Sequence, residues 1–288
     1  MVTTAADAAS IRKTILGSMN KLPPFSPVLT RVLATLADED ISMGELAGMI
    51  ETDTVLAGNI LRVVNSPLYG RRATINSVRH AVAIMGLLKI RNLVLGLSVS
   101  QRWAGAAAPK CWSARQFNLH SLAVAVLSDL LALEQKVSYP EGAFVAGLLH
   151  DVGKLLIATA VPRELELVYD ACQQDRRPLE DVETELLGVT HAEISAAVLE
   201  RWNLPPVIRQ AVLTHHAPNQ ADEGRLHLAH VIQAADRHIN DLGMGMSPYA
   251  HRQEEHADKV LKERGLFEHI ERVSENFVNE FESLRLSL

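Results

Sequence analysis

The pair His150-Asp151 lies inside a long apolar segment and constrains how that segment can be buried. Apolar residues fill positions 144–149 and most of 152–160. Burying an imidazole or a carboxylate without a partner is costly, so the fold has to supply partners for both side chains. Lys154 follows Asp151 by three residues and His150 by four, so on a helix it shares a face with both. The triplet therefore indicates either a buried ion pair or a metal with an anionic ligand.

The composition of the chain favours helices. Hydrophobic residues make up 48% of the 288 residues but aromatic residues only 5%, so the core has to be built from aliphatic side chains. Sheets are enriched in aromatic residues and threonine, whereas this composition suits packed helices. Apolar residues recur at helical spacing, and Ser42 with Glu45 forms a capping-box pattern ahead of one such segment. We therefore predict an all-α protein.

We expect two helical lobes and a tail. The Gly-Ala-Ala-Ala-Pro stretch at 105–109 is the predicted boundary, because it has a weakly structured composition and the helices change in character after it. An N-terminal lobe over 1–105 is then followed by a second helical lobe over 106–245, in which one helix is expected over 141–160. An amphipathic helical tail over 246–288 completes the chain.

The sequence contains no clean membrane span. The longest apolar segments, 122–133 and 143–161, are interrupted by polar or charged side chains, and the N-terminus lacks the pattern of a signal peptide. The only cysteines, Cys111 and Cys172, are too few for a disulfide framework or a thiolate metal site. We therefore expect a cytoplasmic protein with no membrane partner.

Charge is distributed unevenly along the chain, whose formal net charge is −6. The stretch 54–128 contains no Asp or Glu. It contains nine basic residues, namely Arg62, Arg71, Arg72, Arg79, Lys89, Arg91, Arg102, Lys110 and Arg115. A solvated basic face is the simpler interpretation, and a docking surface for a nucleotide or an acidic protein is the alternative. Nucleic acid is disfavoured, because the basic residues lack interleaved aromatic residues.

Further metal-competent side chains flank the pair His150-Asp151 along the chain. They are His120, His191, His215, His216 and Asp236. Imidazole nitrogens suit Zn, Fe, Mn or Ni, and a carboxylate can bridge two ions or orient a bound water. The sequence therefore indicates a site for one or two divalent transition-metal ions.

The order of these residues resembles the HD superfamily of helical metal-dependent phosphohydrolases, whose motif runs His…His-Asp…His…His…Asp. The matching positions are His120, His150, Asp151, His191, His215, His216 and Asp236, and the Val-Gly-Lys continuation to Lys154 matches as well. The segments 60–70, 190–193 and 202–205 resemble HDOD domains, the HD-related output domains of bacterial signalling proteins. This resemblance covers about residues 20–240.

The chain departs from the related HD-GYP phosphodiesterases for cyclic di-GMP at two places. They carry Gly-Tyr-Pro after their histidine pair, whereas Ala217-Pro218-Asn219 follows here. Gln116 stands where some of them use Glu for a third metal ion.

The resemblance implies a bacterial signal-transduction output or regulatory domain that acts through protein–protein contact, in a two-component or cyclic-dinucleotide pathway. An acidic protein partner would then bind the 54–128 stretch. The alternative is a metal-dependent phosphohydrolase acting on a nucleotide. In that case Asp151 would help to hold the ions and Lys154 would stabilise charge in the transition state. The missing Gly-Tyr-Pro favours the output domain, and the complete ligand set keeps the enzyme open.

The turn Asn-Ser-Pro-Leu-Tyr-Gly at 65–70 offers polar groups that a turn alone does not require. We expect the side chains of Asn65, Ser66 and Tyr69 to tie the two lobes together near 106–120. The alternative is local capping of the preceding helix.

Overall fold

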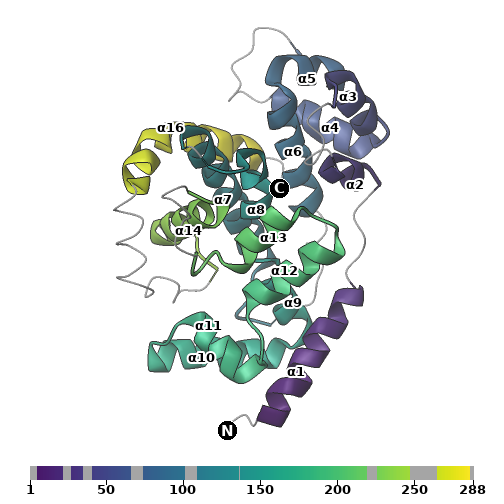
Figure 1. Cartoon of the computed structure of the whole chain (residues 1–288). Helices are drawn as coiled ribbons and strands as arrows, with labels where there is room; N and C mark the ends of the chain where they lie inside the picture. Colours follow the sequence, from purple (N-terminus) through teal and green to yellow (C-terminus); the bar gives the residue numbers. More distant parts are fainter. Residues whose placement is uncertain are drawn as a thin grey trace. The chain divides into compact units, whose positions relative to one another are not determined.

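The structure is a computed structural model. It describes residues 5–21, 27–34, 41–65, 74–100, 109–135, 137–218, 226–246 and 265–285. The described residues are mostly helical (Figure 1), and their only strand-like pairing is one isolated bridge between Val137 and Leu226. The predicted all-α class is confirmed.

The chain forms two compact units. Unit 1 comprises Met1–Pro23 and Gly105–Glu271, and unit 2 comprises Pro24–Ala104 and Arg272–Leu288. This division differs from the predicted lobes at both ends of the chain, because the N-terminal helix belongs to unit 1 and the last helix contributes its C-terminal part to unit 2.

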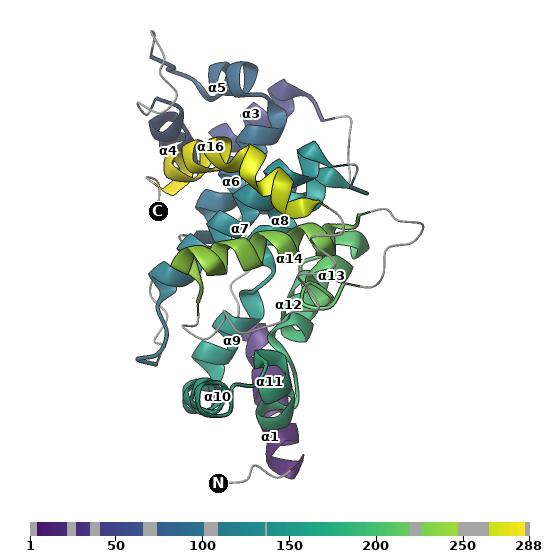
Figure 2. The same ribbon diagram turned by 90° about the vertical axis from the view of Figure 1, so that its left-hand side faces the viewer.

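The elements of unit 1 are α1 (Ala5–Ser18), η1 (Met19–Lys21), α7 (Ala114–Glu134), η3 (Pro140–Gly142), α8 (Ala143–Leu149), α9 (Val152–Ala160), α10 (Pro162–Asp175), α11 (Leu179–Leu187), α12 (His191–Arg201), α13 (Pro206–Leu213), α14 (Leu228–Ile239) and the π-helical turn η5 (Asn240–Met244). Helix α7 packs against α8 and α14, while α12 packs against α9 and α13. Helix α1 packs against α9 and α11 (Figure 2), and its Ile15 is fully buried. This burial explains why α1 belongs to unit 1.

The elements of unit 2 are α2 (Pro27–Ala34), α3 (Met43–Glu51), α4 (Thr54–Val64), α5 (Val78–Met85), α6 (Leu87–Ser100) and the part of α16 (Leu266–Arg285) that follows Glu271. The capping box of Ser42 and Glu45 begins α3 as predicted. The apolar face predicted for the tail is also present, because α16 buries Leu266, Ile270, Val273, Phe277 and Phe281.

The segment expected to be one helix over 141–160 is two helices. Helix α8 ends before His150 and α9 begins after Asp151, whose φ of −104° and ψ of 9° lie outside the helical region. Both side chains at the junction are fully buried, and Asp151 faces imidazoles from neighbouring helices. Hydrophobic spacing could not reveal the break, because both halves are apolar all round.

Two described stretches, Ala114–Glu134 and Pro140–Ala160, match a membrane span in length and apolar composition. In the most apolar 18 residues of these stretches, 78% and 89% of the residues, respectively, are buried. Core helices meet the same criteria, and these two carry the buried polar residues His120, Asp129 and Asp151. Their apolar character is therefore accounted for by the core of unit 1.

The prediction for the turn at 65–70 is wrong for Asn65. Its side-chain amide donates to the carbonyl oxygens of Leu61 and Ile75, and its side-chain oxygen accepts from the backbone N–H of Ile75. All of these partners belong to unit 2, so Asn65 acts locally at the end of α4. Ser66 and Tyr69 lie outside the described residues.

Candidate metal centre

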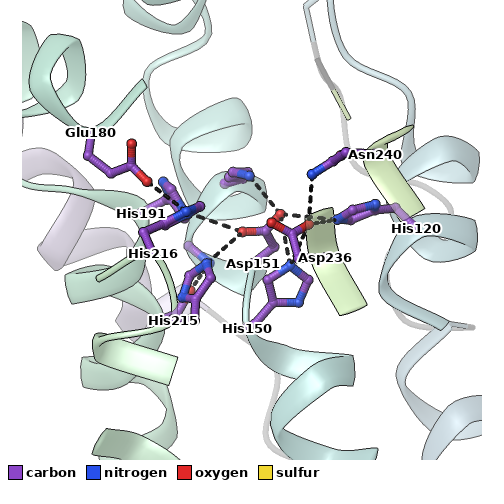
Figure 3. A network of polar contacts seen from close by, with 12 residues as sticks. His120, His150, Asp151, Glu180, His191, His215, His216, Asp236 and Asn240 are labelled. Atoms are coloured by element: carbon purple, nitrogen blue, oxygen red, sulfur yellow. Dashed lines mark hydrogen bonds and ion pairs between the residues drawn. The ribbon is translucent and has the colours of Figure 1, made fainter. Parts of the chain in front are cut away.

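The seven side chains predicted as metal ligands lie together in unit 1 (Figure 3). They come from α7 (His120), the α8–α9 junction (His150 and Asp151), the first residue of α12 (His191), the turn after α13 (His215 and His216) and α14 (Asp236). Five of them are at most 1% exposed, and only Asp236 and His216 have side chains exposed by 11% and 24%. The cluster is therefore buried and reaches solvent at its His216 and Asp236 edges.

Asp151 lies at the centre of the cluster and divides it. Its Oδ2 lies 3.3 Å from Nε2 of His150 and 3.6 Å from Nε2 of His120. Its Oδ1 lies 3.4 Å from Nε2 of His191 and 3.9 Å from Nε2 of His215. The two oxygens of one carboxylate therefore face two different sets of imidazoles.

We call the two sets the Asp236 group and the His216 group. In the Asp236 group, formed by His120, His150 and Asp236, the Asp236 Oδ1 lies 3.1 Å from Nε2 of His120 and 3.7 Å from Nε2 of His150. In the His216 group, formed by His191, His215 and His216, the Nε2 atoms of His191 and His216 lie 2.8 Å apart. Each group shares Asp151, whose carboxylate completes it.

Every histidine of the cluster is fixed in the same way. Each Nδ1 lies within 3.2 Å of an oxygen atom. For His120, His150 and His215 this atom is a backbone carbonyl oxygen, of Met244, Gly147 and Val212 respectively. For His191 and His216 it is a carboxylate oxygen, of Glu183 and Glu180 respectively. Carbonyl and carboxylate oxygens can only accept, so each Nδ1 carries the proton. In a neutral ring the Nε2 atom then offers a lone pair, and all five Nε2 atoms point into the cluster.

The donor atoms fit divalent metal ions. Two ligands that bind one ion at about 2.0–2.2 Å lie roughly 3.0–3.5 Å apart. Three of the closest contacts within the groups lie in this range, at 3.1, 3.3 and 3.4 Å, and the His191–His216 contact is shorter at 2.8 Å. Nε2 of His150, Nε2 of His215 and Oδ1 of Asp151 are buried without a hydrogen-bond partner. Unpaired buried polar atoms are rare, and ions bound at the two groups would satisfy all three. The Asp236 and His216 groups could each hold one ion, with Asp151 as the bridge.

The electrostatics of the cluster also favour a cation. Burial would raise the pKa of Asp151, but His150 and Lys154 hold it well below its usual value. Burial would lower the pKa of His150, but Asp151 and Asp236 raise it to about 10. The carboxylates around His150 therefore favour the positively charged form of its imidazole. A metal ion would supply the same positive charge without the proton.

Local structure places His191 beside Asp151. Thr190 and Glu193 form a capping box that begins α12 at His191. The hydroxyl of Ser195 accepts from the backbone N–H of Gly153, which joins α12 to the start of α9. A Cβ atom on Gly153 would lie 2.1 Å from the carbonyl oxygen of His191. This position therefore requires glycine, since any side chain would push α9 away from α12.

Sequence reasoning missed three residues of the site. Glu180 and Glu183 of α11 contact His216 and His191, and the Asn240 amide donates to Oδ1 of Asp236 at 3.0 Å. The pattern Glu-x-x-Glu on a predicted helix is common on solvated surfaces, so it gave no distinct signal. The burial of Glu183, which is 1% exposed, separates it from an ordinary surface acid.

Lys154 lies where the sequence placed it, on the face of Asp151. Its Nζ lies 2.7 Å from Oδ2 of Asp151, and its side chain is 11% exposed. The predicted ion pair is therefore present, and it lies in the same cluster as the seven candidate ligands, for which a bound metal ion stays a prediction.

The model of the HDOD domain matches residues 22–218 of this chain, about two thirds of its length. The chain belongs to the HDOD family. Its candidate ligand Asp236 lies beyond the matched segment, and the other six lie within it.

Solved structures share the fold of this HDOD protein. An HDOD domain protein of unknown function from Geobacter sulfurreducens is 22% identical, with a TM-score of 0.78, and the match covers 98% of this chain and 99% of that one. A protein from Shewanella amazonensis SB2B, provisionally named a phosphohydrolase, is 23% identical, with a TM-score of 0.72 and coverage of 96% and 98%. A protein from Marinobacter aquaeolei VT8, provisionally named a signal transduction protein, is 20% identical, with a TM-score of 0.73 and coverage of 98% and 66%.

A curated relative of this HDOD protein occurs in Treponema pallidum (strain Nichols), where it is an uncharacterized protein. It is 24% identical over 238 residues, which make up 82% of this chain and 45% of the relative. This chain therefore spans less than half the length of that relative.

Substituting Gly153→Ala tests the close approach of α9 and α12. We expect the free energy of unfolding to fall by about 1–3 kcal/mol, the usual cost of inserting a methyl group into a packed core. Gly58→Ala in α4 is the control, because no heavy atom lies within 4 Å of its Cβ position. Urea denaturation followed by circular dichroism gives both values. Equal stability of the two variants would contradict the proposed packing.

Proposed function

We propose that this HDOD protein is a bacterial signal-transduction output domain that acts through protein contact and whose unit 1 is held together by two divalent metal ions. The observation that carries the proposal is that the candidate ligands come from three helices, one helix junction and one turn of unit 1 and meet at Asp151. An ion bound by such residues links its own occupancy to the packing of the domain. Membership of the HDOD family supports the output role.

The charge of the cluster supports two ions rather than one. Four carboxylates contact its histidines, those of Asp151, Asp236, Glu180 and Glu183, and Lys154 contributes one positive charge. With neutral imidazoles the cluster has a net charge of −3, which is costly in a buried site. Two divalent cations would change this net charge to +1. A mixed set of imidazole and carboxylate ligands suits Zn, Fe, Mn or Ni.

The proposed partner is an acidic protein, but the fold reduces the basic surface that the sequence predicted. Arg79 lies 3.7 Å from Glu51, Lys89 pairs with Glu280, and Arg91 is buried. Acids from outside the 54–128 stretch therefore compensate part of its charge. The other described basic residues of the stretch are Arg62, Lys110 and Arg115, and Arg71, Arg72 and Arg102 lie outside the described residues.

The metal proposal predicts that ions stabilise the protein. Protein purified without chelator should contain about two transition-metal ions per chain. At a free metal concentration of 100 times Kd, each ion should add about 2.7 kcal/mol to the free energy of unfolding. His150→Ala should lose bound metal, whereas His80→Ala in the exposed part of α5 should keep it. Elemental analysis and thermal unfolding with and without chelator provide the measurements. A folded wild-type protein without metal, and with a Tm insensitive to added metal, would contradict the proposal.

A metal-dependent phosphohydrolase acting on a nucleotide is the second candidate function. Bound ions would polarise a phosphoryl group and lower the pKa of a bound water. The observation that favours it is the position of Lys154, whose ammonium group lies at Asp151 with 11% of the side chain exposed. From there Lys154 could bind an anionic phosphoryl oxygen and stabilise the charge of its transition state. The exposed edge of His216 would give a substrate access to the cluster.

The output role predicts negligible turnover of cyclic dinucleotides and mononucleotides by the metal-loaded protein. Positioning of the substrate supplies much of the reduction in an enzyme's barrier, and Ala217-Pro218 after the histidine pair offers no cation to clamp a phosphate. Phosphate or nucleotide release, measured by chromatography, tests this directly. Turnover of roughly 1 per second or faster that is lost in a folded Asp151→Ala variant would instead support the phosphohydrolase.

A further inference from the structure

We propose that Glu183 and Glu180 of α11 are positioning residues. By accepting the Nδ1–H groups of His191 and His216, they allow the His216 group to bind an ion. The inference rests on the proposed metal centre, and it assigns a role to two carboxylates that touch no candidate metal position themselves. It also implies that the two ions are held by different means.

Glu183 fixes His191 through two contacts made by one oxygen. Its Oε2 accepts from the ring Nδ1–H of His191 at 2.7 Å and from the backbone N–H of the same residue at 2.8 Å. The Glu183 side chain is 1% exposed, so this carboxylate is buried next to the Nδ1 side of the His191 ring. Both the tautomer and the direction of the His191 Nε2 lone pair are therefore set by Glu183.

Glu180 takes the same position behind His216, one helical turn earlier on α11. Its Oε1 lies 2.8 Å from the Nδ1 of His216, and its side chain is 21% exposed. The spacing of three residues on one helix thus brings one carboxylate to each of two imidazoles whose Nε2 atoms lie 2.8 Å apart.

The Asp236 group has no comparable carboxylates behind its rings. The Nδ1 atoms of His120 and His150 face the backbone carbonyls of Met244 and Gly147. This group instead has the carboxylate of Asp236 within its own set of candidate ligands. The His216 group offers three imidazoles and shares only Asp151, so it lacks a negative charge of its own.

Glu183 and Glu180 supply this negative charge through the histidine rings that they contact. A carboxylate that accepts the Nδ1–H of a ligating histidine raises the basicity of the ring and stabilises the positive charge of the ion. Loss of such a partner typically weakens metal binding by about 10–100-fold. Neutralising either glutamate should therefore weaken the ion in the His216 group and leave the ion in the Asp236 group unaffected.

Zinc titration of the metal-free full chain against a chromophoric chelator tests the proposal. The variants are Glu183→Gln and Glu180→Gln, which keep an acceptor oxygen of the same shape while removing the charge. Glu185→Gln is the matched control, because Glu185 lies on the same helix, is 57% exposed and pairs with Arg177. Circular dichroism of the metal-free variants checks their folding. Glu180→Gln provides the test if the buried Glu183→Gln does not fold.

We expect the wild-type protein and Glu185→Gln to bind two zinc ions. Each of the other two variants should retain one ion at the wild-type affinity and bind the second about 10–100-fold more weakly. Two ions bound with wild-type affinity by both glutamine variants would overturn the role of α11 while leaving the metal centre in place. A wild-type protein that takes up no zinc, cobalt or manganese would overturn both.

Discussion

The buried carboxylate of Asp151 is the group on which the structure of unit 1 depends. It is fully buried, yet its two oxygens are approached by imidazoles from α7, α12 and the α8–α9 junction, and by the ammonium group of Lys154. A buried carboxylate without such partners would be strongly destabilising. The helices of unit 1 therefore have to converge on Asp151. The residues of the candidate metal centre are thus also core residues of unit 1.

A few features of the fold orient side chains toward Asp151. Helices α8 and α9 are separated at His150 and Asp151, which directs both side chains inward. Gly153 allows α9 to approach the carbonyl oxygen of His191, and the capping box of Thr190 begins α12 at that histidine. Helix α11 then places two carboxylates behind the rings of His191 and His216. Together these features orient ligands that lie far apart in the sequence.

The sequence predicted the helical class and the membership of the cluster, because an apolar segment interrupted by His150 and Asp151 is rare and the ordered histidines resemble a known motif. It did not predict the supporting residues, since Glu183 resembles any acid on a helix until its burial is known. Charge along the chain was also a poor guide to charge in space, because the fold brings Glu280 to Lys89 from outside the acid-free stretch. Similarly, the burial of Ile15 assigns α1 to unit 1, which local periodicity could not determine.

We propose that the carboxylate of Asp151 would be shared by two metal ions, one held by each histidine group. Anomalous diffraction from crystals of the full chain, grown without chelator and measured at the absorption edge of the bound metal, would test it most directly. We expect two peaks on either side of Asp151, one bounded by His120, His150 and Asp236 and the other by His191, His215 and His216. A crystal grown with added metal that shows no peak in the cluster, with only the Lys154–Asp151 ion pair and a protonated His150 between the ligands, would contradict it.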